Sequence, residues 1–397
     1  MRENHPYELA DRINVAREAG FPKVRALMRR AVSEGVTPGG VVWMGVGVQD
    51  KGFVESFCIA EGNQGAQGTP KVTPETIYDL ASLTKPLACA LWFATLVSDG
   101  SLDPKQPIGD VLSIADPMIK RSPCWRLVNH SSGLPAHRRY YEGLAGAIRL
   151  GSNHARCREV ILRMIRETYA DYCPGEKSIY SDLGYLLLEH LCEVVSGESL
   201  IQFWQRCSPS AGLHYRPLNA SISGEQVLPS RYAPTEDCPW REHVLQGEVH
   251  DDNAWLMGGV CGHAGLFGAA EATGLAAGAW LRAWRGDSDA LPASPEVIRW
   301  MCSLDHRAPQ GGSFVLGWDT PSPGYSSAGR QFSRMTIGHL GFTGTSLWID
   351  LEREVVVALL TNRVFPSRAR PESVRGIRWL RPMIHDAIWD ILIPSQE

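Results

Sequence analysis

The sequence lacks the long apolar segments that membrane insertion or export would require. No stretch reaches the roughly 18 apolar residues that span a bilayer, and the N-terminal residues contain no apolar core of the kind found in signal peptides. We therefore expect a cytoplasmic protein without a membrane span. An exported form would require a signal peptide that has already been removed.

Signals for disulfides, metals and nucleic acids are also missing. The ten cysteines include no C-x-x-C pair, and no run of Lys or Arg interleaved with aromatic residues resembles a nucleic-acid footprint. We expect free, buried thiols, no cofactor, and partners that are small molecules or peptides rather than nucleic acids. The sequence leaves the oligomeric state open. There is also no G-x-S-x-G motif, which argues against an α/β-hydrolase.

The composition is that of a globular protein too long for one small core. Hydrophobic residues make up 44% and charged residues 21% of the 397 residues. A chain of this length usually forms two domains or one domain with a large insertion. Strand patterns lie near both ends and helical patterns between them. We expect a sheet domain from residues 1–105 and 290–397, and a mostly helical domain from 106–289.

The periodicity of apolar residues predicts the main elements. Apolar residues recur at helical spacing after Pro22, and two apolar or alternating runs flank the polar pair Gln49 and Asp50, which indicates a hairpin. The predicted helices are 22–35, 155–169, 183–197 and 373–392, and the predicted strands are 39–48, 52–62, 313–320, 344–351 and 354–362.

Ser82 and Lys85 form an S-x-x-K motif at the start of an apolar stretch that continues as a helix to about Asp99. Positions i and i+3 share a helix face, so the hydroxyl and the amine can meet. A Ser hydroxyl becomes a nucleophile when a nearby base takes its proton, and a Lys can be that base if its pKa is lowered. The motif alone is a weak signal and needs support.

Two further motifs supply that support. Tyr180, Ser181 and Asp182 directly precede a predicted helix, where a phenol could relay protons, although Tyr180 could equally pack by its ring with Ser181 or Asp182 as N-cap. His339 and Gly341 stand at the start of a predicted strand followed by a Gly-rich turn. Such an edge strand can present an N–H to an acyl oxygen while the imidazole donates to substrate or to the Tyr oxygen. The alternative is a strand His with an ordinary partner.

The order and spacing of these motifs resemble the serine β-lactamase and penicillin-binding protein superfamily, most closely its class C-like branch of esterases and peptidases. The resemblance extends from about residue 20 to 390. It implies an antiparallel sheet flanked by helices, an inserted mostly helical domain, and an active site between them. The phrases that carry it are TIYDLASLTKPL, LVNHSSGLP, PGEKSIYSDLGYLLLEHL and GHLGFTGTSLWID.

The resemblance also implies roles for individual residues. Ser82 would be the acylated nucleophile, Lys85 its proton acceptor, and Tyr180 the residue that passes the proton to the leaving group and later helps to activate water. The N–H groups of Ser82 and Phe342 would form the oxyanion hole, which His339 would line. Gly341 is expected to contact substrate.

Asp182 departs from the family pattern, which usually has Asn at this position. A carboxylate near Lys85 would raise the pKa of the amine and work against a neutral base. Either Tyr180 is the main base, or Asp182 points elsewhere, or it binds a cationic group of the substrate.

Other polar residues are candidates for the substrate cleft. His250 and Asp252 lie in a His- and Asp-rich segment that lacks metal-ligand spacing, and we expect them to contact substrate rather than a metal. The imidazole of His130 is expected to bond the backbone of a turn. Arg363 follows the last predicted strand, where relatives often bind a substrate carboxylate, a task suited to a guanidinium.

Three functions fit this pattern. The preferred prediction is an amidase or peptidase that acts on muropeptides through an acyl-enzyme in peptidoglycan recycling. The second is a general carboxylesterase with weak β-lactamase activity. The third is a catalytically silent muropeptide-binding protein, suggested by Asp182.

Overall fold

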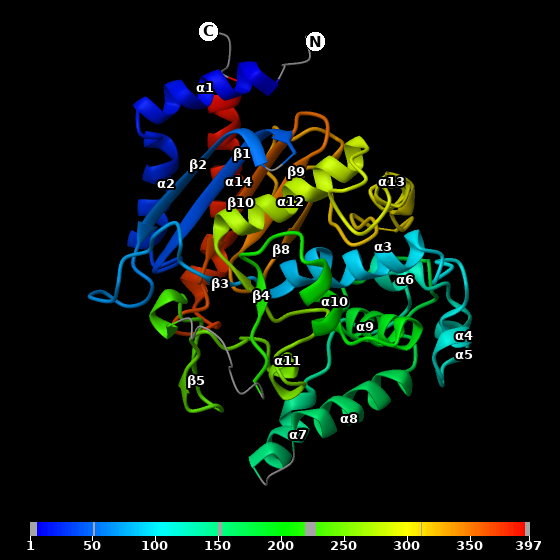
Figure 1. The fold of residues 1–397 in the computed structure, drawn as a ribbon. Helices are drawn as coiled ribbons and strands as arrows, with labels where there is room; N and C mark the ends of the chain where they lie inside the picture. The colour runs from blue at the N-terminus through cyan, green and yellow to red at the C-terminus, as the bar shows by residue number, and fades with distance from the viewer. Residues whose placement is uncertain (1–5, 51, 150–152, 219–227, 311, 394–397) are drawn as a thin grey trace.

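One five-stranded antiparallel sheet joins the two ends of the chain (Figure 1). The strand order is β2-β1-β10-β9-β8, so the N-terminal hairpin pairs with the C-terminal strands through β1 and β10, and β8 lies at an edge. The strands are β1 (Gly39–Gln49), β2 (Gly52–Gly62), β8 (Thr336–Leu340), β9 (Ser346–Asp350) and β10 (Val355–Thr361). The computed structural model describes residues 6–50, 52–149, 153–218, 228–310 and 312–393.

Helices cover both faces of this sheet (Figure 1). Val42 and Met44 of β1 pack into one apolar cluster with three terminal helices, while Val41 and Trp43 face the opposite core. Because both faces are covered, β1 is apolar along nearly its whole length instead of alternating. The terminal helices are α1 (Pro6–Glu18), α2 (Pro22–Ser33) and α14 (Pro371–Leu392), and α12 (Ala270–Arg285) covers the other face.

The position of α12 differs from the predicted division of the chain. Although α12 lies within residues 106–289, it packs on β1 and β10 of the sheet rather than among the helices of that segment. Gly274 allows this close approach, because a Cβ there would lie 2.1 Å from the ring of Trp43. Residues 106–289 therefore supply a helix that covers the sheet, which the periodicity of the sequence did not predict.

The strand predicted at 313–320 is wrong. Val315, Leu316 and Trp318 are fully buried, but this segment has irregular backbone and forms only a single antiparallel bridge, between Asp319 and Gly338 of β8. A short apolar run satisfies a strand pattern even when it fills the core as a loop. The other predicted strands and helices are present, with ends shifted by a few residues.

The rest of the molecule is mostly helical and lies below and to the right of the sheet in Figure 1. The predicted helices 155–169 and 183–197 correspond to α8 and α9. The helices of this part are α3 (Leu91–Ser98), α4 (Ile108–Val111), α5 (Pro117–Arg121), α6 (Trp125–Val128), α7 (Tyr140–Arg149), α8 (His154–Arg166), α9 (Asp182–Ser196), α10 (Leu200–Cys207), α11 (Asp252–Leu256) and α13 (Pro295–Met301). Short strands are β3 (Tyr78–Asp79), β4 (His214–Tyr215), β5 (Asp237–Cys238), β6 (His243–Val244) and β7 (Leu266–Gly268).

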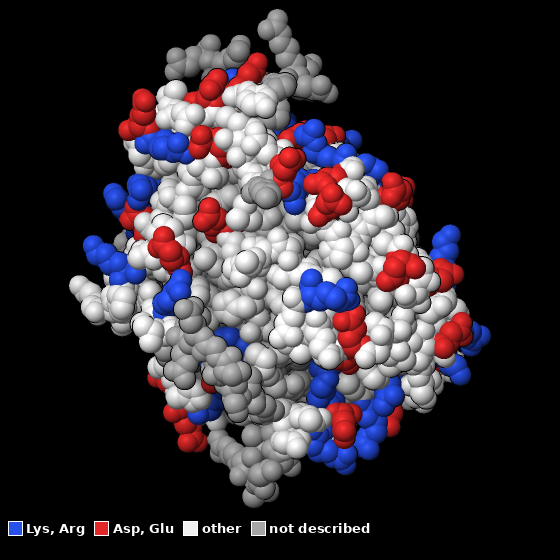
Figure 2. Space-filling view, in the orientation of Figure 1, with Lys and Arg blue, Asp and Glu red and all other residues white. Residues whose placement is uncertain are grey.

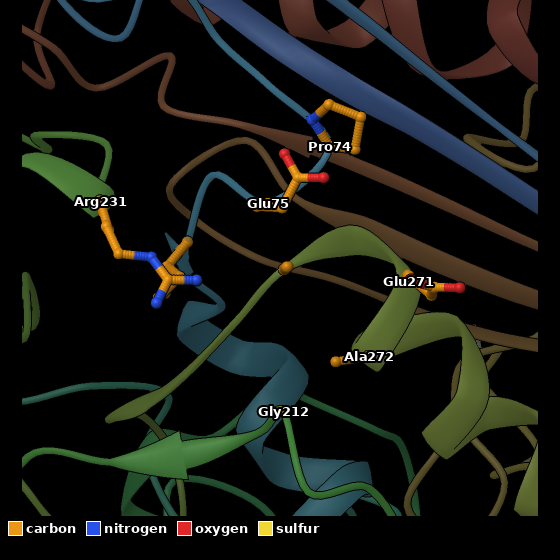
Figure 3. A pocket seen from close by; sticks show the side chains of 8 residues that line it. Pro74, Glu75, Gly212, Arg231, Glu271 and Ala272 are labelled. Carbon is orange, nitrogen blue, oxygen red and sulfur yellow. The ribbon is translucent and has the colours of Figure 1, made fainter. Parts of the chain in front are cut away.

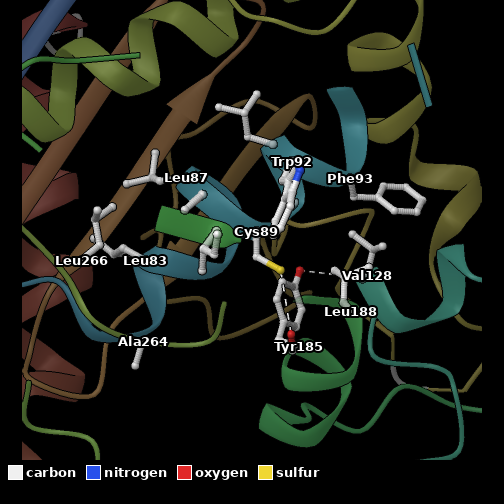
Figure 4. Packing of buried hydrophobic residues seen from close by; sticks show 14 of the residues in the cluster. Leu83, Leu87, Cys89, Trp92, Phe93, Val128, Tyr185, Leu188, Ala264 and Leu266 are labelled. Carbon is white, nitrogen blue, oxygen red and sulfur yellow. Dashed lines mark hydrogen bonds between the residues drawn. The ribbon is translucent and has the colours of Figure 1, made fainter. Parts of the chain in front are cut away.

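The helical stretch that begins at Ser82 runs through the centre of the core (Figure 4). Cys89 and Trp92 pack against Tyr185 and Leu188 of α9, and the Tyr185 hydroxyl donates a 2.9 Å hydrogen bond to the Val128 carbonyl. Among the described residues, this stretch, 81–98, has the length and apolar character of a membrane span, but 78% of it is buried inside the protein. We interpret it as a core helix, and its burial fixes the position of the S-x-x-K motif.

Candidate active site

A cavity of about 860 Å³ lies between the β8 edge of the sheet and the helical part. Its wall combines the three sequence motifs, of which the first and the third lie more than 250 residues apart in the chain. The polar and aromatic lining residues are Ser82, His137, Arg139, Tyr141, Tyr180, Asp182, His250, Asp251, Asp252, Phe314, Asp319, His339, Phe342, Arg363, Arg368, Arg378 and Arg381.

Ser82 is presented by a tight turn at the start of the central helix. The turn Ala81–Leu83 is a 3₁₀ helix, and a π-helical turn, Lys85–Ala90, follows it. The Lys85 Nζ donates to the Ser82 Oγ over 3.0 Å, as the S-x-x-K spacing predicts. Ala81 has a φ of 49°, a conformation that is unfavourable for a residue with a side chain, and the Asp79 carboxylate accepts a 2.8 Å bond from its N–H. The turn that exposes Ser82 is thus held by a buried carboxylate.

Lys85 is fully buried and paired with a carboxylate. Its Nζ donates to Asp182 Oδ1 over 2.8 Å and to the carbonyl of His263 over 3.0 Å. Burial alone would lower the pKa of Lys85, but the charge of Asp182 raises it above its ordinary value. Burial would likewise raise the pKa of Asp182, whereas Lys85 holds it well below its usual range. The two groups form a charged pair, so Lys85 rests as an ammonium ion.

Tyr180 lies above this pair. The Lys85 Nζ is 4.9 Å from the centre of the Tyr180 ring. Burial raises the pKa of Tyr180, while the charge of Lys85 and hydrogen bonding with Lys85 and Ser82 oppose that rise. Ser181 is the N-cap of α9 and accepts a 3.0 Å bond from the Gly184 N–H, which leaves the Tyr180 side chain facing the cavity.

His130 positions Tyr180 from behind. The Ser181 N–H donates to the His130 Nδ1 over 3.0 Å, and the His130 ring lies 4.6 Å from the Tyr180 ring. Burial and the charge of Lys85 hold the pKa of His130 well below its ordinary value, so the imidazole stays neutral. The prediction that His130 bonds the backbone of a turn is confirmed.

His339 faces the cavity with a different hydrogen-bonding role from the predicted one. It lies near the end of β8 rather than at its start, and its Nδ1 is 2.9 Å from the Leu340 carbonyl. A carbonyl only accepts, so Nδ1 carries the proton of the neutral ring and Nε2 is left as an acceptor. Burial, then the charge of Lys85, lowers the pKa of His339 to about 3. Near neutral pH the ring therefore accepts at Nε2, and the prediction that it donates to substrate or to Tyr180 is wrong.

The turn after β8 is fastened to the segment that precedes Ser82. The hydroxyl of Thr343 donates to the Asp79 carbonyl over 2.8 Å, and that of Thr345 to the Leu80 carbonyl over 3.1 Å. These bonds join the Phe342 turn to the segment that precedes Ser82, and both residues line the cavity. Among the described residues no hydrogen bond occupies the N–H of either. Two free N–H groups from neighbouring segments have the composition of an oxyanion hole.

Gly341 is required at this turn but is less available to substrate than predicted. A Cβ on Gly341 would lie 2.7 Å from the Leu80 carbonyl, so only glycine permits the two segments to meet. Its N–H donates to the Thr345 carbonyl and its own carbonyl accepts from Arg381 over 2.8 Å. Both backbone groups of Gly341 are already engaged within the protein.

Arg363 is a buried cation without an anionic partner among the described residues. Its side chain stacks on the Phe342 ring at 4.8 Å, and its Nη1 is buried without a hydrogen bond. Burial, reinforced by Arg370, lowers the pKa of Arg363 to about 10, so the guanidinium remains charged at neutral pH. An uncompensated charge of this kind in a cavity favours an anionic ligand.

His250 and Asp252 line the cavity, and their side chains form hydrogen bonds with other residues of the protein. The His250 Nε2 lies 3.1 Å from Glu236, and Asp252 accepts from Arg241 and Arg368 over 2.8 and 3.0 Å. The prediction that the two residues line the cleft agrees with the structure, and their contact with substrate stays a prediction. They stabilise the wall, and His250 stacks on Phe342 at 5.7 Å.

His137 is the active-site residue that sequence reasoning missed. Its Nδ1 lies 3.2 Å from Asp182 Oδ2, on the opposite side of the carboxylate from Lys85. This hydrogen bond raises the pKa of His137. With Lys85 on one oxygen and His137 on the other, Asp182 is held in place and is not a free group for a substrate cation. The only signal in the sequence is the position of His137 just after the LVNHSSGLP phrase.

A smaller hollow of about 220 Å³ lies beside the start of α12 and shares no residue with the main cavity (Figure 3). Glu75, Arg231 and Glu271 are its charged residues. No group of three or more His, Cys, Asp or Glu side chains with metal-binding geometry occurs in the part of the chain that is described. On the face shown in Figure 2, basic and acidic side chains are interspersed.

The fold and the Ser82 site together define a serine hydrolase with a penicillin-binding-protein architecture, and comparison with known proteins gives the family. A model of the Beta-lactamase family matches residues 23–378. The chain therefore belongs to the Beta-lactamase family of the serine β-lactamase and penicillin-binding protein superfamily.

Individual relatives agree with this assignment. A curated protein of Escherichia coli O157:H7, named putative D-alanyl-D-alanine carboxypeptidase, is 31% identical over 329 residues, covering 76% of this chain and 73% of the relative. The octameric penicillin-binding protein homologue from Pyrococcus abyssi has a TM-score of 0.66 at 21% identity, covering 90% of this chain and 76% of that one. EstCE1, a hydrolase with promiscuous acyltransferase activity, has a TM-score of 0.69 at 19% identity, covering 94% and 100%.

Proposed function

We propose that this serine hydrolase is a peptidase or amidase of muropeptides that works through an acyl-enzyme on Ser82. The observation that carries the proposal is the joint presence, in one cavity, of Ser82 hydrogen-bonded to a buried Lys85 and of the unpaired Arg363. The first pair supplies a nucleophile, and the second supplies an anchor for the free carboxylate of a peptide. The names of the curated relatives, which refer to D-alanyl-D-alanine cleavage, support a peptide substrate.

The proton movements follow from the charges of the site. Because Asp182 keeps Lys85 charged, the proton that must leave before reaction leaves Tyr180, and the phenolate is stabilised by the adjacent ammonium. The phenolate then takes the Ser82 proton as Oγ bonds to the substrate carbonyl carbon. The resulting oxyanion lies between the N–H groups of Ser82 and Phe342.

Collapse of this intermediate completes the first half of the reaction. Tyr180 gives its proton to the leaving nitrogen as the C–N bond breaks, which leaves an ester on Ser82. Water then attacks the ester, Tyr180 takes the water proton, and the proton returns to Ser82 Oγ as the acid is released. With the cytoplasmic location that the sequence leads us to expect, the substrates would be imported wall fragments.

Replacing Arg363 with alanine is expected to lower kcat/KM for a carboxylate-bearing muropeptide by about 10- to 100-fold, because an unpaired carboxylate in a closed site costs a few kcal/mol. Turnover of p-nitrophenyl acetate, which has no carboxylate to bind, should change little. Arg121→Ala, which removes an exposed arginine of α5, is the matched control. Equal losses on both substrates would show that Arg363 acts only on the structure of the Phe342 turn.

Asp182→Asn is expected to move the acidic limb of the pH profile of kcat/KM to lower pH. The charge of Asp182 raises the pKa of Tyr180 as well as that of Lys85, so its removal lets the Tyr180 phenolate form at a pH lower by about 1–3 units. Steady-state rates between pH 5 and 10 measure this shift. An unchanged limb would show that Asp182 does not control the protonation of Tyr180 and Lys85.

Incubation with a panel of muropeptides, simple esters and nitrocefin, followed by mass spectrometry, tests the proposed function. We expect cleavage of carboxylate-bearing peptides. Good turnover of esters with no muropeptide cleavage would favour the carboxylesterase alternative, and no turnover of any substrate would favour the binding protein.

A further inference from the structure

Most carboxylates of the main cavity are paired with basic side chains. Four carboxylates line it, and three of these are paired with a Lys, Arg or His side chain. Asp182 holds Lys85, and Asp251 holds His263 over 3.0 Å. Asp252 is paired with Arg241 and Arg368.

Asp319 is the exception. No cation lies within ion-pair distance of its carboxylate among the described residues. Its Oδ1 accepts from the neighbouring Thr320 N–H over 2.9 Å, and Ser313 also forms a hydrogen bond with the side chain. Burial raises the pKa of Asp319, and the hydrogen bonds from Ser313 and Thr320 and the charge of Arg307 offset only part of that rise. Asp319 and Arg363 thus both lack a direct ion-pair partner among the described residues.

The backbone of Asp319 places it at one end of the open edge of β8. Its N–H and carbonyl pair with Gly338 over 2.7 and 2.8 Å, and this bridge closes the edge at that point. The edge is open from His339 onward, and Arg363 stacks on Phe342 at the other end. Gly338 and Phe342 are four residues apart, which at a rise of about 3.3 Å per residue separates the two ends by at most ~13 Å.

We propose that the cavity binds both charged groups of a zwitterionic peptide. Asp319 binds a free ammonium group on one side of the scissile carbonyl, and Arg363 binds a free carboxylate on the other. This inference rests on the proposed peptidase function and specifies its substrate class. A side-chain amine, such as that of a lysine or another diamino acid, has the charge and the reach for the Asp319 end. Neutral peptides and simple esters carry no charged group that could bind Asp319 or Arg363.

The test uses two peptides that end in the same D-alanyl-D-alanine carboxylate and carry a lysine whose ε-amine is either free or acetylated. Wild-type protein is expected to favour the free amine in kcat/KM by about tenfold or more, the usual scale for a charge-assisted hydrogen bond. Asp319→Asn should abolish that preference by slowing only the free-amine peptide. Asp289→Asn, which removes the same charge from an exposed loop outside the cavity, should retain it.

Binding of the same two peptides to Ser82→Ala, measured by calorimetry, separates this inference from the proposed function. A free-amine preference that is lost in Ser82→Ala/Asp319→Asn supports the inference even if neither peptide is cleaved, which would overturn only the peptidase function. Cleavage or binding of both peptides with equal efficiency by proteins that contain Asp319 would overturn the inference and leave the peptidase function intact. Failure of the Ser82→Ala protein to bind either peptide would overturn the inference as well.

Discussion

Replacing Ser82 with alanine is expected to abolish covalent labelling of the protein by a fluorophosphonate or a penicillin. The Ser82 Oγ is the hydroxyl that accepts a hydrogen bond from the buried ammonium of Lys85, and it stands beside two free N–H groups that can hold an oxyanion. Neither feature is useful without a nucleophile at this position. Intact-protein mass spectrometry should show one adduct on the wild type and none on the variant.

The matched control is Ser288→Ala, which removes an exposed serine outside the cavity and should leave labelling unchanged. The substitution of Ser82 removes one oxygen from the cavity wall, so the variant should keep the thermal stability of the wild type within about 1 kcal/mol. Full labelling of Ser82→Ala would contradict the assignment of the nucleophile.

The second large effect is expected at Lys85. Lys85→Ala should lower the rate of acylation by at least ~100-fold, the usual scale for loss of a proton-transfer group. The ammonium ion stabilises the Tyr180 phenolate and positions the Ser82 hydroxyl, so both the base and the nucleophile lose support. Stopped-flow acylation by nitrocefin or a penicillin measures this rate.

Loss of stability must be separated from loss of chemistry in this variant. Without Lys85, the half-buried Asp182 has lost its strongest partner, and breaking a buried ion pair commonly costs about 3–5 kcal/mol, which is the upper range for this pair. The double variant Lys85→Ala/Asp182→Asn leaves no unpaired charge and should recover most of that stability. It should remain inactive, and recovery of acylation by the double variant would show that Lys85 serves only to hold the fold.

The predictable features are local in sequence or belong to a known set of motifs. Ser82 and Lys85 meet because three residues make about one helical turn, and the hairpin of β1 and β2 follows from two apolar runs around Gln49 and Asp50. Charge chemistry likewise anticipated that Asp182 would raise the pKa of Lys85. These inferences need only neighbouring residues or a known motif.

The parts that were not predictable depend on contacts between distant segments. His137 reaches Asp182 across 45 residues, and no pattern in the sequence pairs them. The proton position on His339 depends on the direction of the Leu340 carbonyl, which periodicity does not encode. The hydrogen bonds of His250 and Asp252 were not predictable either, because their partners, Glu236 and Arg368, become neighbours only in the folded chain.

The segment 313–320 illustrates the same limit for the fold. Its apolar residues are buried as a strand would be, but the chain here forms only the bridge from Asp319 to Gly338. Burial and strand formation give the same apolar pattern over so few residues. The irregular backbone has a consequence for the site, because it brings Asp319 to the cavity wall.

The central claim is that peptide cleavage passes through an ester on Ser82. The most direct measurement mixes the protein with a peptide ending in D-alanyl-D-alanine, quenches it with acid within the first turnovers, and sequences the digest by mass spectrometry. We expect the acyl fragment on the peptide that contains Ser82, together with one equivalent of released C-terminal amino acid. An acyl fragment on another residue, or cleavage at the wild-type rate by Ser82→Ala, would contradict the account.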